Sequence, residues 1–147
     1  MANDAVIVFP TDFSASSRAA LPWALQMAAA LKARIDCVYV VEEPQVYATL
    51  DMGPVPLPST DDLVASARAR LASFVTQNLA GLTPAAGQAV LVGRPADEIV
   101  GHARAQGASL IIMATHGYSG VKHVLLGSTT ESVLRHADCP VLSIRSP

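Results

Sequence analysis

The chain contains few charged residues, few cysteines and no long apolar run. Only 15% of its 147 residues are charged and 51% are hydrophobic, which excludes a disordered chain and predicts a well-filled core. No apolar stretch approaches the roughly 20 residues that span a bilayer. No basic segment precedes the short apolar run at residues 6–9, as one would in a signal peptide. We therefore expect a cytoplasmic protein with no membrane partner.

Positive charge is also scarce and dispersed. The formal net charge is −2, and the ten lysines and arginines are scattered singly along the chain. This pattern is typical of a solvated surface, whereas a nucleic-acid interface gathers basic residues into a patch or stripe. Nucleic acid is therefore not an expected partner.

The two cysteines, Cys37 and Cys139, form no metal-binding or redox motif. Cys37 lies in an apolar run and Cys139 directly precedes Pro140. In an intracellular protein such residues are expected to be reduced and packed. The chain has no Cys-x-x-Cys pair and no His/Cys cluster, so a structural zinc site is not expected, and the sequence identifies no metal ligand.

Short apolar runs alternate with segments of helical periodicity, which is typical of an α/β domain with a parallel sheet. At 147 residues the chain is expected to form a single domain spanning residues 1–147. Strands are predicted at residues 6–9, 35–41, 88–92, 110–114 and 141–144.

Four helices are predicted between these strands. The first spans residues 14–34, with an apolar face that includes Leu31, with Trp23 packed, and with Pro22 inside it, where proline should bend the axis. The second begins at Thr60, the third begins near Pro95, and the last spans residues 128–136. Ser128 and Glu131 have the spacing of a capping box at the start of that last helix.

The connection over residues 43–60 is unusually long for a compact domain and carries four prolines and one glycine. It is interpreted as a lid, a partner-binding loop or a partly disordered segment.

Polar residues follow two of the predicted strands. Pro10, Thr11 and Asp12 follow the first strand, and Thr115 and His116 follow the fourth. Ligands of open parallel sheets bind beyond the carboxyl ends of the strands, where the winding reverses. If these strands are neighbours, both loops face one crevice, and Asp12 could accept a hydrogen bond from a ribose or reach a metal.

The second loop has the features of a phosphate site. It contains glycines and ends at a helix N-terminus, where backbone N–H groups and the helix dipole favour an anion. The phosphate side would consist of Gly117, Gly120, Gly127, Ser128 and Thr129, and His116 is a further candidate contact. The alternative is that Asp12 to Ser14 is only a helix-capping turn and that Gly127-Ser128 is only a tight turn before a helix.

On these motifs the chain resembles the universal stress proteins, and the likeness runs from Val6 to Arg145. It rests on Pro10 to Ser14, Val40 to Glu43, Gly93-Arg94-Pro95 with Ile99, and above all on Thr115-His116-Gly117 through Gly127-Ser128 to Val141. The ATP-binding branch of that family has the motif Gly-x2-Gly-x9-Gly-Ser/Thr, whose second part is matched by Gly117, nine residues and Gly127-Ser128.

The chain departs from that motif at two positions. Ala114 stands where the motif has its first glycine. The alanine would be strained if this position requires a positive φ, and it would be a mild change if the position requires only a small side chain. We favour the second interpretation because Ala114 continues an apolar strand. Tyr118 stands where relatives often carry a basic residue, which removes one counter-charge for phosphate.

The resemblance implies an open, twisted, parallel five-stranded sheet in the order 3-2-1-4-5 with helices on both faces, as in adenine nucleotide α-hydrolase-like domains. It implies a homodimer formed through the edge strand Val141–Ile144. It also implies that ATP, accompanied by Mg²⁺, is held by the matching residues Pro10, Thr11, Asp12, Val40, Met113, Ala114, Gly117, Gly127, Ser128 and Thr129.

The predicted function is that of an ATP-binding regulatory protein of the stress response. No nucleophile, base and orienting group can be assembled from neighbouring motifs, so ATP hydrolysis would be slow and incidental. Two alternatives stay open: a nucleotide-independent protein-interaction module of the same fold, and an enzyme of the wider α-hydrolase-like group.

Overall fold

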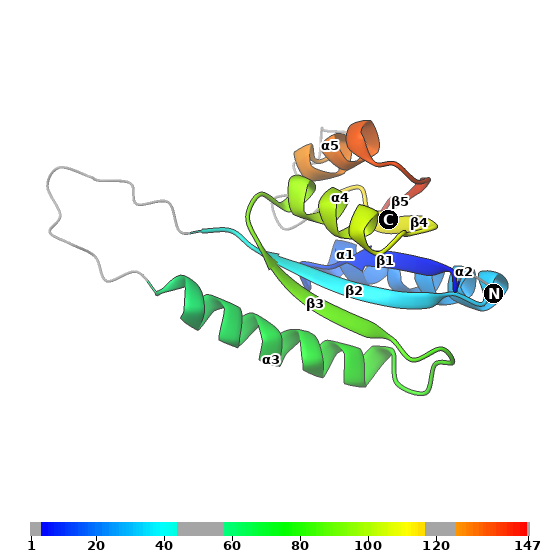
Figure 1. Ribbon diagram of the computed structural model, residues 1–147, viewed down its shortest axis with the longest axis horizontal. Helices are drawn as coiled ribbons and strands as arrows, with labels where there is room; N and C mark the ends of the chain where they lie inside the picture. Colours follow the sequence, from blue (N-terminus) through cyan, green and yellow to red (C-terminus); the bar gives the residue numbers. More distant parts are fainter. Residues whose placement is uncertain (1–3, 44–57, 117–125, 147) are drawn as a thin grey trace, which may run out of the picture.

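The computed structural model describes residues 4–43, 58–116 and 126–146, which form one parallel sheet covered by helices (Figure 1). The strand order is β3-β2-β1-β4-β5, with every pairing parallel, as the resemblance implied. The strands are β1 (Val6–Pro10), β2 (Arg34–Val41), β3 (Gly87–Val92), β4 (Leu110–Ala114) and β5 (Val141–Ile144). The predicted strands are confirmed, to within one residue at each end.

Helices cover both faces of the sheet. They are α1 (Ala15–Ala19), α2 (Leu21–Leu31), α3 (Thr60–Asn78), α4 (Pro95–Ala105) and α5 (Ser128–His136). One core cluster joins the sheet to α2 and α3, and a second joins it to α4 and α5. The two layers are separated in Figure 1, where α4 and α5 lie above the sheet and α3 lies below it.

The central strand β1 supplies side chains to both cores. Ile7 and Phe9 pack beneath α2 and α3, whereas Val8 packs on the side of α4 and α5. All three are fully buried, which explains why this strand is apolar at successive positions rather than at alternate ones.

The single helix predicted for residues 14–34 is wrong, because the chain forms two helices that meet at Ala20. Ala20 ends α1 and begins α2, so Pro22 lies in the first turn of α2, where a missing N–H costs no helical hydrogen bond. The second helix ends at Leu31, and Lys32 follows in the left-handed conformation with φ 52°.

The break also changes which face of α2 is buried. Ala24 and Ala28 are buried, whereas Leu31 and Trp23 are 44% and 47% exposed. The expectations that Leu31 lies on the buried face and that Trp23 is packed are therefore wrong. A periodicity counted from Ser14 cannot follow the turn of the axis at Ala20.

Both cysteines are free, as predicted. Cys37 is fully buried, and burial, with a smaller contribution from the neighbouring Asp36, raises the pKa of its thiol to about 12. Partial burial, with a smaller contribution from Asp138, raises the pKa of the Cys139 thiol above its ordinary value.

We expect Cys37 in the folded protein to resist alkylation at pH 8, because the thiolate is the reactive form and the thiol is inaccessible. Cys139 is expected to react slowly, and both cysteines should react at once in urea. Intact-mass spectrometry after iodoacetamide treatment measures this, and equal labelling of the two residues in the folded protein would contradict it.

No helix within the described part of the chain has the length and apolar character that crossing a membrane requires. Most of the proline-containing segment predicted as a lid or partner loop, residues 44–57, lies outside the described residues.

Candidate functional site

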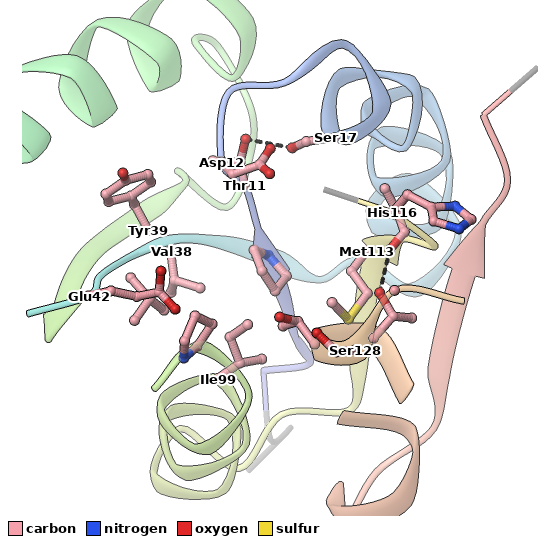
Figure 2. Close-up of a pocket in the computed structure, with 17 residues that line it drawn as sticks. Thr11, Asp12, Ser17, Val38, Tyr39, Glu42, Ile99, Met113, His116 and Ser128 are labelled. Atoms are coloured by element: carbon pink, nitrogen blue, oxygen red, sulfur yellow. Dashed lines mark hydrogen bonds between the residues drawn. The ribbon is translucent and has the colours of Figure 1, made fainter. Parts of the chain in front are cut away.

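A cavity of about 500 Å³ lies at the carboxyl ends of β1, β2 and β4, between the first turns of α4 and α5. This is where the direction of winding reverses in the strand order, so the cavity lies where ligands of open parallel sheets bind. Its volume falls in the usual range for small-molecule sites. Figure 2 shows Thr11 and Asp12 on one side of the cavity, Val38 and Glu42 on a second, and Met113, His116 and Ser128 on a third.

The structure brings most of the predicted site residues together around this cavity. Gly117 and Gly120 lie outside the described residues, and so does Tyr118. The other predicted residues all line the cavity: Pro10, Thr11, Asp12, Val40, Met113, Ala114, His116, Gly127, Ser128 and Thr129.

The loop after β1 is held by its own hydrogen bonds. The Thr11 and Ser17 hydroxyl oxygens lie 2.6 Å apart, and the Phe13 N–H donates to Thr11 Oγ1 at 3.0 Å. The Ser14 N–H donates to Asp12 Oδ1 at 3.0 Å, and the Ser14 side chain caps α1 by accepting from the Ser17 N–H. The capping role proposed as an alternative for this turn is therefore real. The same bonds fix the Asp12 carboxylate at the edge of the cavity.

Phe13 adopts a backbone conformation that the local residue pattern does not predict. Its φ is 63°, a left-handed geometry that costs an L-residue about 1–2 kcal/mol. Ring contacts offset this cost: Phe13 stacks on Tyr39 with centroids 5.1 Å apart and meets Phe74 edge-on at 5.8 Å. The Arg70 guanidinium lies 4.4 Å from its centroid. Because Tyr39 lines the cavity, these contacts connect the cavity wall to α3.

The opposite side of the cavity is formed where α5 begins. Gly127 is the N-cap of this helix, and its N–H donates to the Thr115 carbonyl at 2.7 Å. Thr130 Oγ1 donates to the Ala114 carbonyl at 2.8 Å. These two bonds attach the first turn of α5 to the end of β4.

Two expectations for this turn are wrong. The Gly127 N–H cannot serve a phosphate while it is bonded to Thr115. The Ser128–Glu131 capping box does not form, because the cap is one residue earlier, and Glu131 instead pairs with Arg135 at 2.8 Å. An N-cap built by backbone geometry alone has no side-chain signature in the sequence.

The remaining donors of the turn are still suited to an anion. The first N–H groups of any α-helix lack a carbonyl partner within the helix, and here these include the amides of Ser128 and Thr129, both of which line the cavity. The positive end of the α5 dipole lies at this same turn and also favours an anion there. A side chain at position 127 would crowd this turn, since a Cβ there would lie 3.1 Å from the Thr115 carbonyl oxygen.

Ala114 is the last residue of β4 and is 8% exposed. Its backbone is part of the strand, and it is not among the described residues with positive φ. Alanine is therefore not strained at this position, and the interpretation that the position requires only a small side chain stays a prediction.

The charged side chains on the described wall of the cavity are the carboxylates of Asp12 and Glu42. His116 also lines it, with Nδ1 3.1 Å from Thr115 Oγ1. Among the described residues, no group of three or more histidine, cysteine, aspartate or glutamate side chains could hold a metal ion.

Several residues of the cavity wall were missed by sequence reasoning. Pro95 and Ile99 come from α4, and their motif was recognised without being assigned to the site. Only the packing of α4 against β2 places them there, and no local pattern reports that packing. The other missed residues are Ser17, Val38, Tyr39, Glu42 and Thr130.

Comparison with known proteins agrees with this geometry. The sequence model of the universal stress protein family matches residues 5–145 of the chain. The chain belongs to the universal stress protein family. Universal stress protein MJ0531 of Methanocaldococcus jannaschii is 31% identical over 148 aligned positions, which cover 96% of this chain and 82% of that relative.

Solved structures of other universal stress proteins have the same fold. UspA from Lactobacillus plantarum superposes with a TM-score of 0.77 at 26% identity, covering 99% of this chain and all of that one. A universal stress protein crystallised in complex with cAMP superposes with a TM-score of 0.70 at 26% identity, covering 98% of each chain.

Proposed function

We propose that this universal stress protein binds an adenine nucleotide in the cavity between β1, β2, β4 and the start of α5. The observation that carries the proposal is the convergence of two features on one cavity at the reversal of the strand order. They are the Asp12 loop and the first-turn amides of α5, which have no carbonyl acceptor within the helix. The complex of a related universal stress protein with cAMP supports this ligand class.

In the proposed arrangement the two ends of the cavity recognise different parts of the ligand. The apolar surface of Val40, Ile99 and Met113 holds the base, and Asp12 accepts a hydrogen bond from the ribose. The amides of Ser128 and Thr129 hold phosphate, with Gly117, Gly120 and His116 as further proposed contacts. Pro10, Thr11, Ala114 and Gly127 shape the backbone around the ligand.

We propose ATP with Mg²⁺ as the physiological ligand. The carboxylates of Asp12 and Glu42 on the described wall repel a free triphosphate, and a divalent cation bound to the phosphates reduces that repulsion. Ser128 is placed to bind phosphate rather than to attack it, so hydrolysis is at most slow. The protein would act as a regulatory, stress-response nucleotide sensor in the cytoplasm.

The edge strand β5 is the proposed dimer interface. It is the last strand of the sheet, and all four of its residues are only half-buried. An uncovered apolar edge strand favours pairing with another strand. Light scattering coupled to gel filtration should therefore give twice the mass of the chain.

Calorimetric titration tests the nucleotide proposal. We expect ATP with Mg²⁺ to bind with micromolar affinity, equivalent to about −8 kcal/mol, and to bind more weakly when EDTA removes the cation. Titrations with ADP, AMP and cAMP define the preference among phosphates. If none of these ligands produces heat or a thermal shift at millimolar concentration, the nucleotide proposal is wrong and the interaction-module alternative is favoured.

A further inference from the structure

A largely covered polar pair lies outside the cavity, near the amino end of β2. His102 Nε2 of α4 lies 2.7 Å from Asp36 Oδ2 of β2, and their side chains are 12% and 8% exposed. Neither residue lines the cavity. This histidine–aspartate contact is a directional bond between a helix and a strand whose buried contacts are mostly apolar.

The absence of a side chain at Gly87 leaves room for the Asp36 carboxylate. Gly87 is the partner of Asp36 in the neighbouring strand, and a Cβ at position 87 would lie 2.7 Å from Asp36 Oδ1. A second, exposed polar contact lies beside the pair, since Arg34 Nη2 of β2 donates at 3.3 Å to Oε1 of Gln106, the C-cap residue of α4. Polar bonds therefore attach the C-terminal half of α4 to the start of β2.

The same two elements form one wall of the cavity at their other ends. Ile99 of α4 lines the cavity and is three residues, or about one helical turn, before His102. Val38 of β2 lines it and is two residues after Asp36, on the same face of the strand. Ile99 and Val38 also share one core cluster. The spacing of α4 and β2 at the polar pair is therefore carried directly to the cavity wall.

We propose that Asp36 and His102 form a positioning pair that sets the gap between α4 and β2 and thereby the shape of the base-binding end of the cavity. This inference rests on the proposed nucleotide function. Apolar contacts are non-directional and allow α4 to shift along the sheet, whereas a short, largely covered hydrogen bond favours a single position. The Arg34–Gln106 bond is longer and exposed to solvent, so it constrains α4 less. Neither residue touches the ligand, and both act through Ile99 and Val38.

The test compares variants at His102 that differ in their ability to donate to Asp36. His102→Leu removes the donor, whereas His102→Gln places an amide N–H near the position of Nε2. We expect His102→Leu to weaken ATP binding at least tenfold and His102→Gln to stay within threefold of the unsubstituted protein. His102→Asn, whose amide is too short to reach, should resemble His102→Leu while keeping a polar side chain if the leucine variant folds poorly.

A stability control separates positioning from general weakening of the fold. Leu79 is 2% exposed at the end of α3, in the other core layer, and does not line the cavity. Leu79→Ala should lower the melting temperature and leave the dissociation constant for ATP within threefold. The inference is overturned if the leucine and glutamine variants bind ATP equally, or if Leu79→Ala weakens binding as much as His102→Leu.

Hydrogen exchange provides a readout that does not depend on nucleotide. The amides of α4 in His102→Leu should exchange at least tenfold faster than in the unsubstituted protein, while those of α3 are unchanged. If neither the unsubstituted protein nor any variant binds nucleotide, the proposed function is wrong. Hydrogen exchange that is faster only in α4 would then still support the inference that the Asp36–His102 pair holds α4 in position. Unchanged exchange in α4 would overturn the inference whether or not nucleotide binds.

Discussion

Replacing Gly127 with valine is expected to weaken ATP binding at least a hundredfold, which corresponds to about 2.7 kcal/mol. A Cβ at this position would lie 3.1 Å from the Thr115 carbonyl oxygen and 3.6 Å from the His116 Cα, both of which are backbone atoms. The branched side chain must therefore push the first turn of α5 away from β4. That movement displaces the amides of Ser128 and Thr129 from the phosphate position, and calorimetry with ATP and Mg²⁺ measures the loss.

Gly101→Ala is the matched control for this substitution. Gly101 lies inside α4, and a Cβ there would meet no atom within 4 Å. Alanine is favoured over glycine inside a helix by roughly 0.5–1 kcal/mol, so this variant should be slightly more stable and should bind ATP normally. Circular dichroism establishes that both variants are folded. A Gly127→Val protein that is folded and binds ATP within threefold of the original would place the phosphate elsewhere.

The largest expected effect on stability comes from Phe9→Ala. Phe9 is fully buried in the central strand, and its ring stacks on Phe74 with centroids 6.5 Å apart. Truncating a buried phenylalanine typically lowers the free energy of unfolding by 3–5 kcal/mol, because the surrounding core does not close over the cavity. The free energy of unfolding of a small domain is only about 5–15 kcal/mol, so this variant should be close to unfolding at 37 °C.

Trp23→Ala removes a larger side chain and serves as the comparison. Because Trp23 is 47% exposed, we expect this substitution to lower the free energy of unfolding by less than about 1 kcal/mol. Urea unfolding followed by circular dichroism gives both values. If the tryptophan variant were as unstable as the phenylalanine variant, the exposed position of Trp23 on α2 would be wrong.

The strands could be predicted closely because each is a short, mostly apolar run bounded by polar residues, glycine or proline. The ranges of β4 and β5 were predicted to the residue, and β1, β2 and β3 are each longer by one residue. The residues that precede or follow these runs, such as Arg34 and Gly87, are not apolar and join the sheet only through their backbone pairing. Hydrophobic pattern alone cannot report such pairing.

The helix that was predicted wrongly shows a different limit. Pro22 was a visible breaker, yet the apolar face on either side of it suggested continuity. Proline is tolerated in the first turn of a helix, so it indicates a new start as readily as a bend. Ala20, the buried residue at the junction, is a good helix former and fits either one bent helix or two separate helices.

The cavity was predicted in outline because the carboxyl ends of neighbouring parallel strands must meet. The residues of α4 that line the cavity were not predicted, because their position depends on how the helix that follows β3 crosses the sheet. The left-handed φ of Phe13 is harder still to predict, because the Tyr39 and Phe74 rings that stabilise it lie far away in the sequence.

The position of β1 in the middle of the sheet has a consequence for synthesis on the ribosome. This strand emerges first, but it pairs with both β2 and β4, and β4 begins only at Leu110. One edge of β1 therefore has no partner strand until the residues of β4 have been made. Until those residues are made, the nascent chain exposes an apolar strand edge, and such edges are prone to aggregation.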